Sequence, residues 1–506
     1  MGVARSANLV SHDMMKICLV ASFPPSVRPL NEYSFHIARE IQQHKDIELT
    51  ILADELDDYA FATDLRGDSP KAQHFPELPG VNVIRCWKFG SLATPVRLLN
   101  KIRELKPDVV WFNLVFSSFG ALNTPFAAFA GLSVPALTRA AGFYTHITLH
   151  QITEHVDFAS AGLRREKLHR VGAEMATRAL LQAHTVSVLL SAYRRTLKAK
   201  YSAENVLVGT HGTFTAVPRP PDFSKRGNPD IRILAFGHWG TYKRLEKLME
   251  AFPSVLKRVP NARLIVAGGN HPAAAGYWES IRDAQVGGLP IEFLGYIPQK
   301  EVPELFRTSS LLVMPYDSST GSSGPAHQAC EYGLPIVCAD IPDFHCMASD
   351  DDMAISFYKL GDATDLGDKL VSVLQSPELQ RQMSLHNYEA GVQMTMEAVV
   401  RTYLRWFKLH KSKRTIDREG VITRLRRGLP SWSSRFGSFP GAWKLEADLL
   451  PSNADREISP EILDGSKVGP STSGQVKSPA LCQPRSGSEQ TQNDWYDSNS
   501  ELEKAG

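Results

Sequence analysis

The feature of this sequence that most constrains its fold is residues 311–340, where two short apolar runs flank a glycine- and serine-rich stretch. We predict a strand at 311–315, a loop, a helix that opens at Pro325 and stops at Gly333, and a second strand at 336–339. Proline suits the first helical turn, where its missing N–H would have no partner, and glycine suits the residue just past a helix end. Loop amides and a helix dipole in this order can hold an anion such as phosphate, although a tight turn without a ligand is the alternative.

Strand and helix patterns alternate in both halves of the chain. In the first half, strands are expected at 17–21, 48–53, 81–84, 109–113 and 135–137, with helices at 33–44 and 95–105. In the second half, strands are expected at 231–236, 263–267, 291–294, 311–314 and 336–339. This alternation predicts mostly parallel sheets covered by helices on both faces. Two such layers facing each other leave a cleft at the carboxyl ends of their strands, where open α/β folds bind ligands.

The length and the composition divide the chain into regions. At 506 residues it is too long for one ordinary core. We therefore predict an α/β protein with Rossmann-like αβα domains at 15–215 and 230–400, joined by a Pro/Gly-rich linker and followed by a final crossover helix at 401–420. Residues 1–14 and 451–506 are predicted to be disordered, the latter because Ser, Gly, Asn, Gln and Pro dominate them.

The charge and the cysteines narrow the function classes. A net charge of +2 creates no overall field for nucleic acid, so none is expected as a partner. The six cysteines show no CxxC pair or zinc spacing, and several lie in apolar contexts, which fits buried thiols in a reducing compartment. The absence of zinc spacing gives no reason to expect a metal site. No apolar run is long enough to span a bilayer and no signal peptide is recognisable, so we expect a cytoplasmic protein.

A second glycine turn follows the apolar run at 231–236. Gly237 lies at the predicted carboxyl end of this strand, and Lys243 follows six residues later, before a helical run. A lysine there can reach an anion at the mouth of the cleft and neutralise the charge that develops on a departing phosphate. The alternative is that Lys243 and Arg244 are solvated residues in the first turn of a helix, where cations are slightly unfavourable.

Taken in order, these segments resemble the retaining glycosyltransferases of family 4, which have the GT-B fold, over roughly residues 15–410. The turn from Gly237 to Lys243 looks like the family's glycine–arginine…lysine motif for the donor diphosphate. Residues 311–340 are similar to its E-x7-E region and to the glycine–leucine–proline strand that follows. Residues 148–151 (TLHQ) resemble its threonine–leucine–histidine segment, and 206–212 fit the stretch near its domain crossover.

The resemblance implies roles for particular residues. Lys243, His238 at the family's arginine position and His150 are the implied catalytic residues, with His150 contacting the donor sugar. The implied donor-binding residues are Gly237, Thr320, Gly321, Ser322, Ser323, Gly324 and Gln328. Ser322 and Ser323 also suit capping of the helix, with or without a ligand.

Besides His238 at the arginine position, the chain departs from the family pattern in two places. Thr320 and Gln328 stand where the family has its two glutamates. Gln328 can still hydrogen-bond a ribose through its amide, and Glu331, three residues later, could stand in for a lost carboxylate. The first-half loop at 24–30 contains no glycine, which predicts an altered acceptor site.

The function implied is that of a retaining glycosyltransferase that moves a hexose from a nucleoside-diphosphate sugar to a hydroxyl acceptor in polysaccharide or glycolipid synthesis. The acceptor that we have in mind is a lipid-linked glycan, which offers such a hydroxyl group. No metal cofactor is expected, because Lys243, His238 and the amides of 321–324 would do the work of a cation. Two alternatives stay open: a glycosyltransferase-like binding or scaffold protein without activity, motivated by the lost glutamates, and a sugar-nucleotide epimerase on the same fold.

Basic and aromatic side chains are interleaved near the end of the chain. Residues 405–444 contain eleven Lys/Arg against two Asp/Glu, together with Trp406, Trp432 and Trp443. This composition suits the anionic, cytoplasmic face of a membrane, where aromatic rings lie at headgroup level. We predict that residues 421–450, hereafter the basic segment, dock on the inner face of the membrane. The alternative for 399–411 is a final helix that packs back across the domains.

Overall fold

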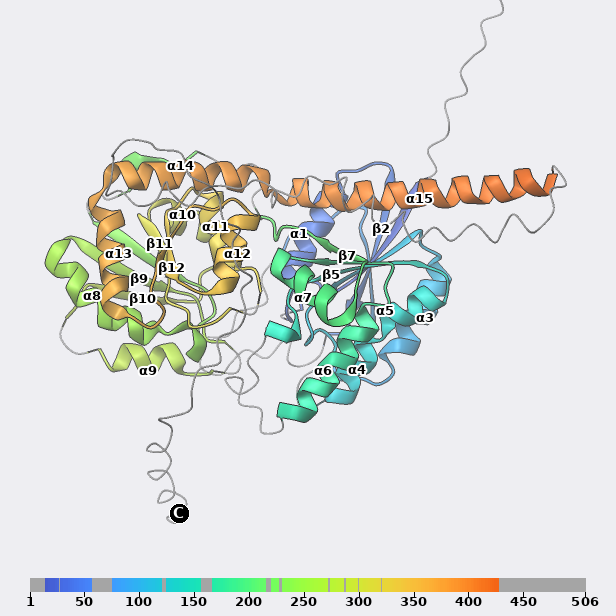
Figure 1. The fold of residues 1–506 in the computed structure, drawn as a ribbon, viewed down its shortest axis with the longest axis horizontal. Helices are drawn as coiled ribbons and strands as arrows, with labels where there is room; N and C mark the ends of the chain where they lie inside the picture. Colours follow the sequence, from blue (N-terminus) through green and yellow to red (C-terminus); the bar gives the residue numbers. More distant parts are fainter. Residues whose placement is uncertain are drawn as a thin grey trace, which may run out of the picture. The chain divides into compact units, whose positions relative to one another are not determined.

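The computed structural model describes residues 14–26, 28–56, 75–120, 124–155, 166–214, 220–226, 230–271, 274–285, 288–298, 300–319 and 321–426 (Figure 1). The disorder predicted for residues 1–13 and 451–506 therefore concerns residues outside the described ranges. The basic segment also lies outside them, apart from the backbone of 421–426, which continues the last helix.

The first half of the chain forms a seven-stranded parallel sheet in the order β3-β2-β1-β4-β5-β6-β7. Its strands are β1 (Met15–Val20), β2 (Ile47–Asp54), β3 (Asn82–Trp87), β4 (Val109–Leu114), β5 (Tyr144–Leu149), β6 (Thr185–Val188) and β7 (Val206–Val208). Its helices are α1 (Asn31–Ile41), α3 (Thr94–Leu105), α4 (Pro125–Leu132), α5 (Val134–Ala140), α6 (Glu166–Leu180) and α7 (Ser191–Tyr201). Every residue of the central strands β4 and β5 is buried, as expected for parallel strands covered on both faces.

The second half repeats this plan with a six-stranded parallel sheet in the order β10-β9-β8-β11-β12-β13. Its strands are β8 (Ile231–Phe236), β9 (Ala262–Ala267), β10 (Ile291–Gly295), β11 (Leu311–Met314), β12 (Ile336–Ala339) and β13 (Ile355–Tyr358). Its helices are α8 (Leu245–Arg258), α9 (Tyr277–Asp283), α10 (Val302–Arg307), α11 (Gly324–Glu331), α12 (Pro342–Asp350), α13 (Ala363–Gln375) and α14 (Pro377–Gln393). The six strands of this sheet follow the same order as the first six strands of the other sheet, and the two parallel sheets confirm the predicted fold class of two Rossmann-like domains.

The last described helix, α15 (Met396–Arg426), packs on the first domain, although it follows the second one in sequence. Val400, Tyr403 and Phe407 of α15 lie in one buried apolar cluster with Ile17 of β1 and Ile37 of α1. Charged side chains lie outside this cluster: Lys408 pairs with Asp46 at 2.6 Å, and Lys411 pairs with Asp108 at 3.0 Å. The aromatic residue Phe407 of the basic and aromatic stretch is thus a core residue.

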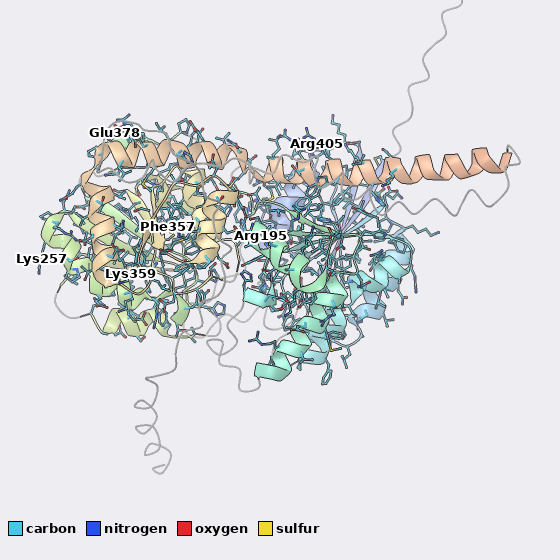
Figure 2. All side chains as sticks on the ribbon, viewed as in Figure 1. Arg195, Lys257, Phe357, Lys359, Glu378 and Arg405 are labelled. Carbon is cyan, nitrogen blue, oxygen red and sulfur yellow. The ribbon has the colours of Figure 1, made fainter. Side chains whose placement is uncertain are left out.

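Many charged residues of the helices point to the solvent, as the amphipathic pattern requires. Arg195 on α7, Lys257 on α8, Glu378 on α14 and Arg405 on α15 are all exposed (Figure 2). No helix among the described residues is both long and apolar enough to cross a membrane.

The chain crosses between the sheets at two places that contact each other. After β7, the amide of Thr213 donates to the carbonyl of Met394 at 2.8 Å, and the amide of Met396 donates back to Thr213 at 3.1 Å. In the linker, the half-buried guanidinium of Arg226 donates to the carbonyls of Tyr332 and Gly333 at 2.7 and 3.0 Å. Part of the predicted linker is therefore fixed to the second domain.

One predicted strand is wrong. Residues 135–137 belong to helix α5, in which Pro135 occupies the first turn, where its missing N–H costs nothing. The strand of this region is β5, ten residues further on, whose polar side chains find partners inside the sheet. His146 bonds Thr185 at 2.7 Å, and the indole N–H of Trp111 donates to Thr148 at 2.9 Å. These bonds allow a strand of polar composition to be buried.

Candidate functional site

A recess of about 260 Å³ lies at the carboxyl ends of strands from both sheets. The first half of the chain contributes Leu30, His150, Gln151 and His211 to its wall, and the second half contributes Tyr242, Lys243, Tyr316 and residues 318–319 and 321–325. Of the residues that sequence reasoning selected, this recess brings together Lys243, His150 and the run 321–324. Its lining contains no carboxylate among the residues that the structure describes.

Lys243 is the one lysine or arginine among the described residues that line this recess, and it is 7% exposed. It ends a short 3₁₀ turn (Thr241–Lys243), and Arg244 then takes a left-handed conformation (φ 46°) that opens α8. Its ammonium lies 4.7 Å from the ring centre of Tyr316 and 5.8 Å from that of Trp239. The alternative of a solvated lysine is therefore wrong.

Burial changes the acid–base behaviour of Lys243. Among the described residues, no carboxylate lies within ion-pair distance of its ammonium, and aromatic rings surround it. Desolvation lowers the pKa of Lys243 from 10.5 to about 7. Aromatic faces offset only part of the desolvation of a cation, so this site is suited to an anion that the protein itself does not supply.

Gly237 makes room for this ammonium at the end of β8. Its φ of +139° is outside the range that side chains favour, and an added Cβ would lie 2.8 Å from the Lys243 Nζ atom. Any other residue here would displace the ammonium. Gly237 therefore contributes to the site by leaving room for the Lys243 ammonium, and this is why a glycine stands at this position.

The glycine loop connects β11 to α11 and presents backbone amides to the recess. The amides of Gly321, Ser322 and Gly324 have no hydrogen-bond partner among the residues that the structure describes. Ser323 precedes the helix but its side chain forms no capping bond, and its hydroxyl instead contacts the sulfur of Met314 at 3.4 Å. The expectation that Ser323 caps this helix is therefore wrong, and the Gly324 amide at the start of the helix has no partner among the described residues.

Gly321 also brings the two halves of the site together. An added Cβ at Gly321 would lie 2.8 Å from the backbone carbonyl oxygen of His150, which directly follows β5. This close approach of two backbones explains the glycine. It also places the end of β5, and with it His150, against the glycine loop.

His150 is fixed by hydrogen bonds that begin in α1. The hydroxyl of Ser34 donates to the Leu30 carbonyl at 2.7 Å, and the Asn113 amide N–H donates to Ser34 at 3.0 Å. Because the Asn113 side-chain nitrogen is thereby identified as the donor, its side-chain oxygen accepts from the Nε2–H of His150 at 2.7 Å. Burial, and then the nearby His211, lower the pKa of His150 well below its usual value, so the ring is neutral.

Several predicted residues lie outside the lining of the recess. His238 is exposed and does not line the recess. An exposed imidazole carries full charge only below its usual pKa of ~6.5, unlike the arginine whose position it takes. Gln328 lies on α11 and does not line the recess, and Thr320 lies outside the described residues.

Glu331 does not replace the missing carboxylates. Its carboxylate is buried and accepts a hydrogen bond from the Phe214 amide at 3.3 Å, on the segment that leaves the first domain. Glu331 therefore links α11 to the domain crossing, away from the recess.

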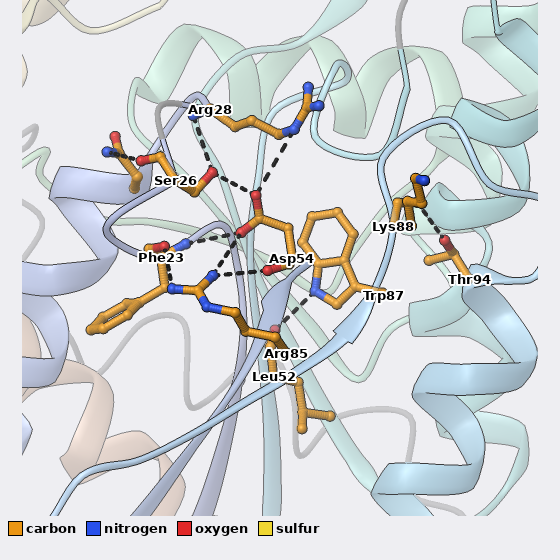
Figure 3. A network of polar contacts seen from close by, with 10 residues as sticks. Phe23, Ser26, Arg28, Leu52, Asp54, Arg85, Trp87, Lys88 and Thr94 are labelled. Carbon is orange, nitrogen blue, oxygen red and sulfur yellow. Dashed lines mark hydrogen bonds and ion pairs between the residues drawn. The ribbon is translucent and has the colours of Figure 1, made fainter. Parts of the chain in front are cut away.

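The loop after β1 is held by a buried carboxylate (Figure 3). Asp54 is 1% exposed and accepts hydrogen bonds from the Ser26 hydroxyl at 2.5 Å and the Phe23 amide at 3.3 Å. Arg85 donates to the backbone carbonyls of Asp54 and Pro24 at 2.8 and 2.6 Å. The loop ends at Leu30, which adopts a left-handed φ of 67° and lines the recess. A leucine thus occupies a conformation that favours glycine, which explains how a loop without glycine can still form this turn.

Sequence reasoning missed Tyr242, Tyr316, His211 and Leu30. Tyr242 and Tyr316 lie beside motifs that were recognised, one before Lys243 and one after β11, and a search for aromatic neighbours of the lysine would have found them. His211 lies in the stretch 206–212 that was assigned only to the domain crossing.

The second domain matches a known family, and the fold matches many solved structures. Residues 230–376 match the family model described as glycosyl transferases group 1. Sucrose-phosphate synthase (tll1590) from Thermosynechococcus elongatus is 13% identical, with a TM-score of 0.59 over 79% of this chain and 100% of that one. The α,α-trehalose 6-phosphate synthase from Burkholderia multivorans is 11% identical, with a TM-score of 0.56 over 80% and 98%. Anabaena Alr3699/HepE, solved in complex with UDP, is 13% identical, with a TM-score of 0.56 over 78% and 100%.

Identities this low establish the fold alone, and no curated protein sequence matches the chain. The fold of the whole described chain is GT-B. With the group 1 domain in its second half, the chain is a glycosyltransferase.

Proposed function

We propose that this protein is a retaining glycosyltransferase that transfers a hexose from a nucleoside-diphosphate sugar to a hydroxyl acceptor. The proposal is supported most by Lys243, a buried ammonium in the recess whose nearest neighbours are aromatic rings. A diphosphate that approaches the amides of Gly321 and Gly324 would meet this ammonium in a site of low dielectric constant. UDP in the similar fold of Anabaena HepE agrees with such a ligand.

The proposed reaction breaks one bond at the anomeric carbon and forms another. The bond between the anomeric carbon and the diphosphate oxygen breaks, and the acceptor oxygen bonds to that carbon on the same face. The acceptor's hydroxyl proton passes to the departing diphosphate. Lys243 and the loop amides stabilise the negative charge that develops on the leaving group, so we propose that these groups supply the positive charge without a metal.

The donor would lie with its two ends in different surroundings. Lys243 and the amides of the glycine loop attract phosphate oxygens, whereas the neutral ring of His150 offers no charge. We therefore propose that the diphosphate lies at the second domain and the hexose at the β5 end.

The experiment that tests this proposal measures binding and transfer separately. Thermal stabilisation by UDP, GDP and their hexose conjugates identifies the nucleotide. With the best donor, Lys243→Ala should lower transfer to a hydroxyl acceptor by roughly 100-fold or more, the scale of one lost charge-stabilising contact. Lys257→Ala, an exposed lysine of α8, is the matched control. NMR of the product shows whether the anomeric configuration is retained.

The outcomes separate the proposed enzyme from the alternatives. Nucleotide binding without transfer or hydrolysis would favour a binding protein, consistent with Thr320 and Gln328 in place of two glutamates. Interconversion of the sugar nucleotide without an acceptor would identify an epimerase. Equal transfer by Lys243→Ala and the wild-type protein would refute the role of this lysine.

We further propose that the acceptor is lipid-linked and that the basic segment brings the protein to an anionic membrane surface. The support is composition alone, since the side chains of this segment lie outside the described residues. Vesicle binding of the full chain would decrease at high salt, because screening weakens attraction between exposed charges.

A further inference from the structure

His211 is a recess residue that the proposed reaction leaves without a role. It lies on the segment that connects β7 to the crossing at Thr213. Its backbone carbonyl accepts a hydrogen bond from the Tyr33 hydroxyl at 2.6 Å, which fixes the segment to α1. Its ring lies at the wall of the recess, and its Cε1 atom is the nearest atom, at 4.0 Å, to a Cβ built on Gly324.

The tautomer of His211 follows from its one hydrogen bond. Its Nδ1 atom lies 3.0 Å from the Gly212 carbonyl oxygen, which can only accept, so Nδ1 carries the hydrogen. The Nε2 atom then has a lone pair and can only accept. Among the residues that the structure describes, none donates to this Nε2 atom.

The ring of His211 is held in place and stays neutral. Tyr33 packs edge-on against it with ring centres 5.2 Å apart, and His327 lies 4.8 Å away. His327 is itself held between the Ser323 carbonyl at 2.7 Å and the Asp351 carboxylate at 3.1 Å. Burial, and then His327, lower the pKa of His211 to about 3.

His150 presents the same chemistry from the other side. Because its Nε2–H donates to Asn113, its Nδ1 atom also carries a lone pair. The centres of the His150 and His211 rings are 6.0 Å apart. Lone pairs repel phosphate oxygens but accept hydrogen bonds from hydroxyl groups, so this wall of the recess suits a polyol and not the diphosphate.

We propose that the Nε2 atom of His211 accepts a hydrogen bond from a hydroxyl group of the transferred hexose and thereby determines which sugar is used. The inference rests on the proposed donor. It extends the site to the domain crossing, because His211 lies two residues before Thr213, where the chain leaves the first domain. His211 is a specificity-determining residue because it contacts a group that does not react.

The test measures calorimetric affinities of the full chain for UDP, GDP, UDP-glucose and GDP-mannose, and continues with the conjugate that binds more tightly. Analogues of that conjugate in which each sugar hydroxyl in turn is replaced by hydrogen cannot donate at that position. His211→Phe keeps a flat ring between Tyr33 and His327 but has no acceptor, whereas His211→Gln keeps an acceptor oxygen.

His211→Phe should bind the nucleotide alone as the wild type does, but should bind the sugar conjugate about tenfold more weakly, the effect of one hydrogen bond. One deoxy analogue should bind the wild-type protein more weakly than the full conjugate does. His211→Phe should bind this analogue and the full conjugate equally well. His211→Gln should recover part of the affinity for the full conjugate that His211→Phe loses. Such a double-mutant result would not arise if His211 only supported the fold.

Two results would overturn the inference. One is an equal loss of nucleotide and conjugate affinity in His211→Phe, and the other is a set of deoxy analogues whose losses are all the same in both proteins. If neither UDP nor GDP bound the wild-type protein, the donor proposal itself would fall, and with it the role of His211, so the two failures are distinguishable.

Discussion

Replacement of Lys243 by methionine should stabilise the ligand-free protein at low pH. A fall of the lysine pKa from 10.5 to about 7 corresponds to roughly 5 kcal/mol of destabilisation at pH 6, where the side chain is protonated in both the folded and the unfolded state. Methionine fills a similar volume between the rings of Trp239 and Tyr316 without a charge. Water penetration would reduce the gain, and even half of it would raise Tm by a few degrees.

The pH dependence gives the sign of this effect. Between pH 7 and pH 10.5 the unfolded state binds more protons at Lys243 than the folded state does, so the wild-type protein gains stability as pH rises. Lys243→Met lacks this gain. Its advantage over the wild type should therefore shrink by about 2.5 kcal/mol between pH 6 and pH 9, from the same linkage relation.

The assay is urea unfolding of the wild type, Lys243→Met and Lys257→Met at pH 6 and pH 9. Lys257 is exposed in the last turn of α8. Its replacement should therefore change the free energy of unfolding by less than about 0.5 kcal/mol at either pH. A Lys243→Met protein that is less stable than the wild type at pH 6, or whose difference from the wild type does not depend on pH, would refute the reasoning.

Three further predictions concern ligands. Affinity for UDP should fall by up to about tenfold per pH unit above pH 7 as Lys243 loses its proton, and this fall should be absent from Lys243→Met in calorimetry. Gly321→Ala should weaken UDP binding by about tenfold or more, because its Cβ would lie 2.8 Å from the His150 carbonyl oxygen. Gly269→Ala is the control, since no atom lies within 4 Å of an added Cβ there. Equal affinities of the two variants for UDP would contradict the close approach at Gly321. A chain that ends after Gly420 should keep nucleotide binding but no longer co-sediment with vesicles of acidic lipid, and equal sedimentation of both chains would remove the membrane proposal.

Much of the fold was predictable because the strands of the second half are locally apolar. β8, β9, β11 and β12 lie within a residue or two of their predicted positions, since buried parallel strands have continuous apolar sequences. β5 was missed because Tyr144, Thr145 and His146 are polar, and their burial depends on partners such as Thr185 on a strand about forty residues away. No local pattern contains that information.

The site was predictable where it is local in sequence. Lys243 and the glycine loop follow strands directly, and the ends of parallel strands meet at one edge of a sheet. The burial of Lys243 depends instead on Tyr316, some seventy residues away, and the role of His211 on the first and second domains together. Charge, spacing and propensity describe none of these contacts.

The position of α15 has a consequence for synthesis of the chain. The apolar face of β1 and α1 is completed by Val400, Tyr403 and Phe407, and the ribosome makes these residues only after the whole second domain. At about 5–20 residues per second, the roughly 190 residues between β7 and α15 take on the order of 10–40 s. During that time the nascent first domain shows an apolar surface to solvent or to chaperones. The first domain expressed alone should therefore aggregate.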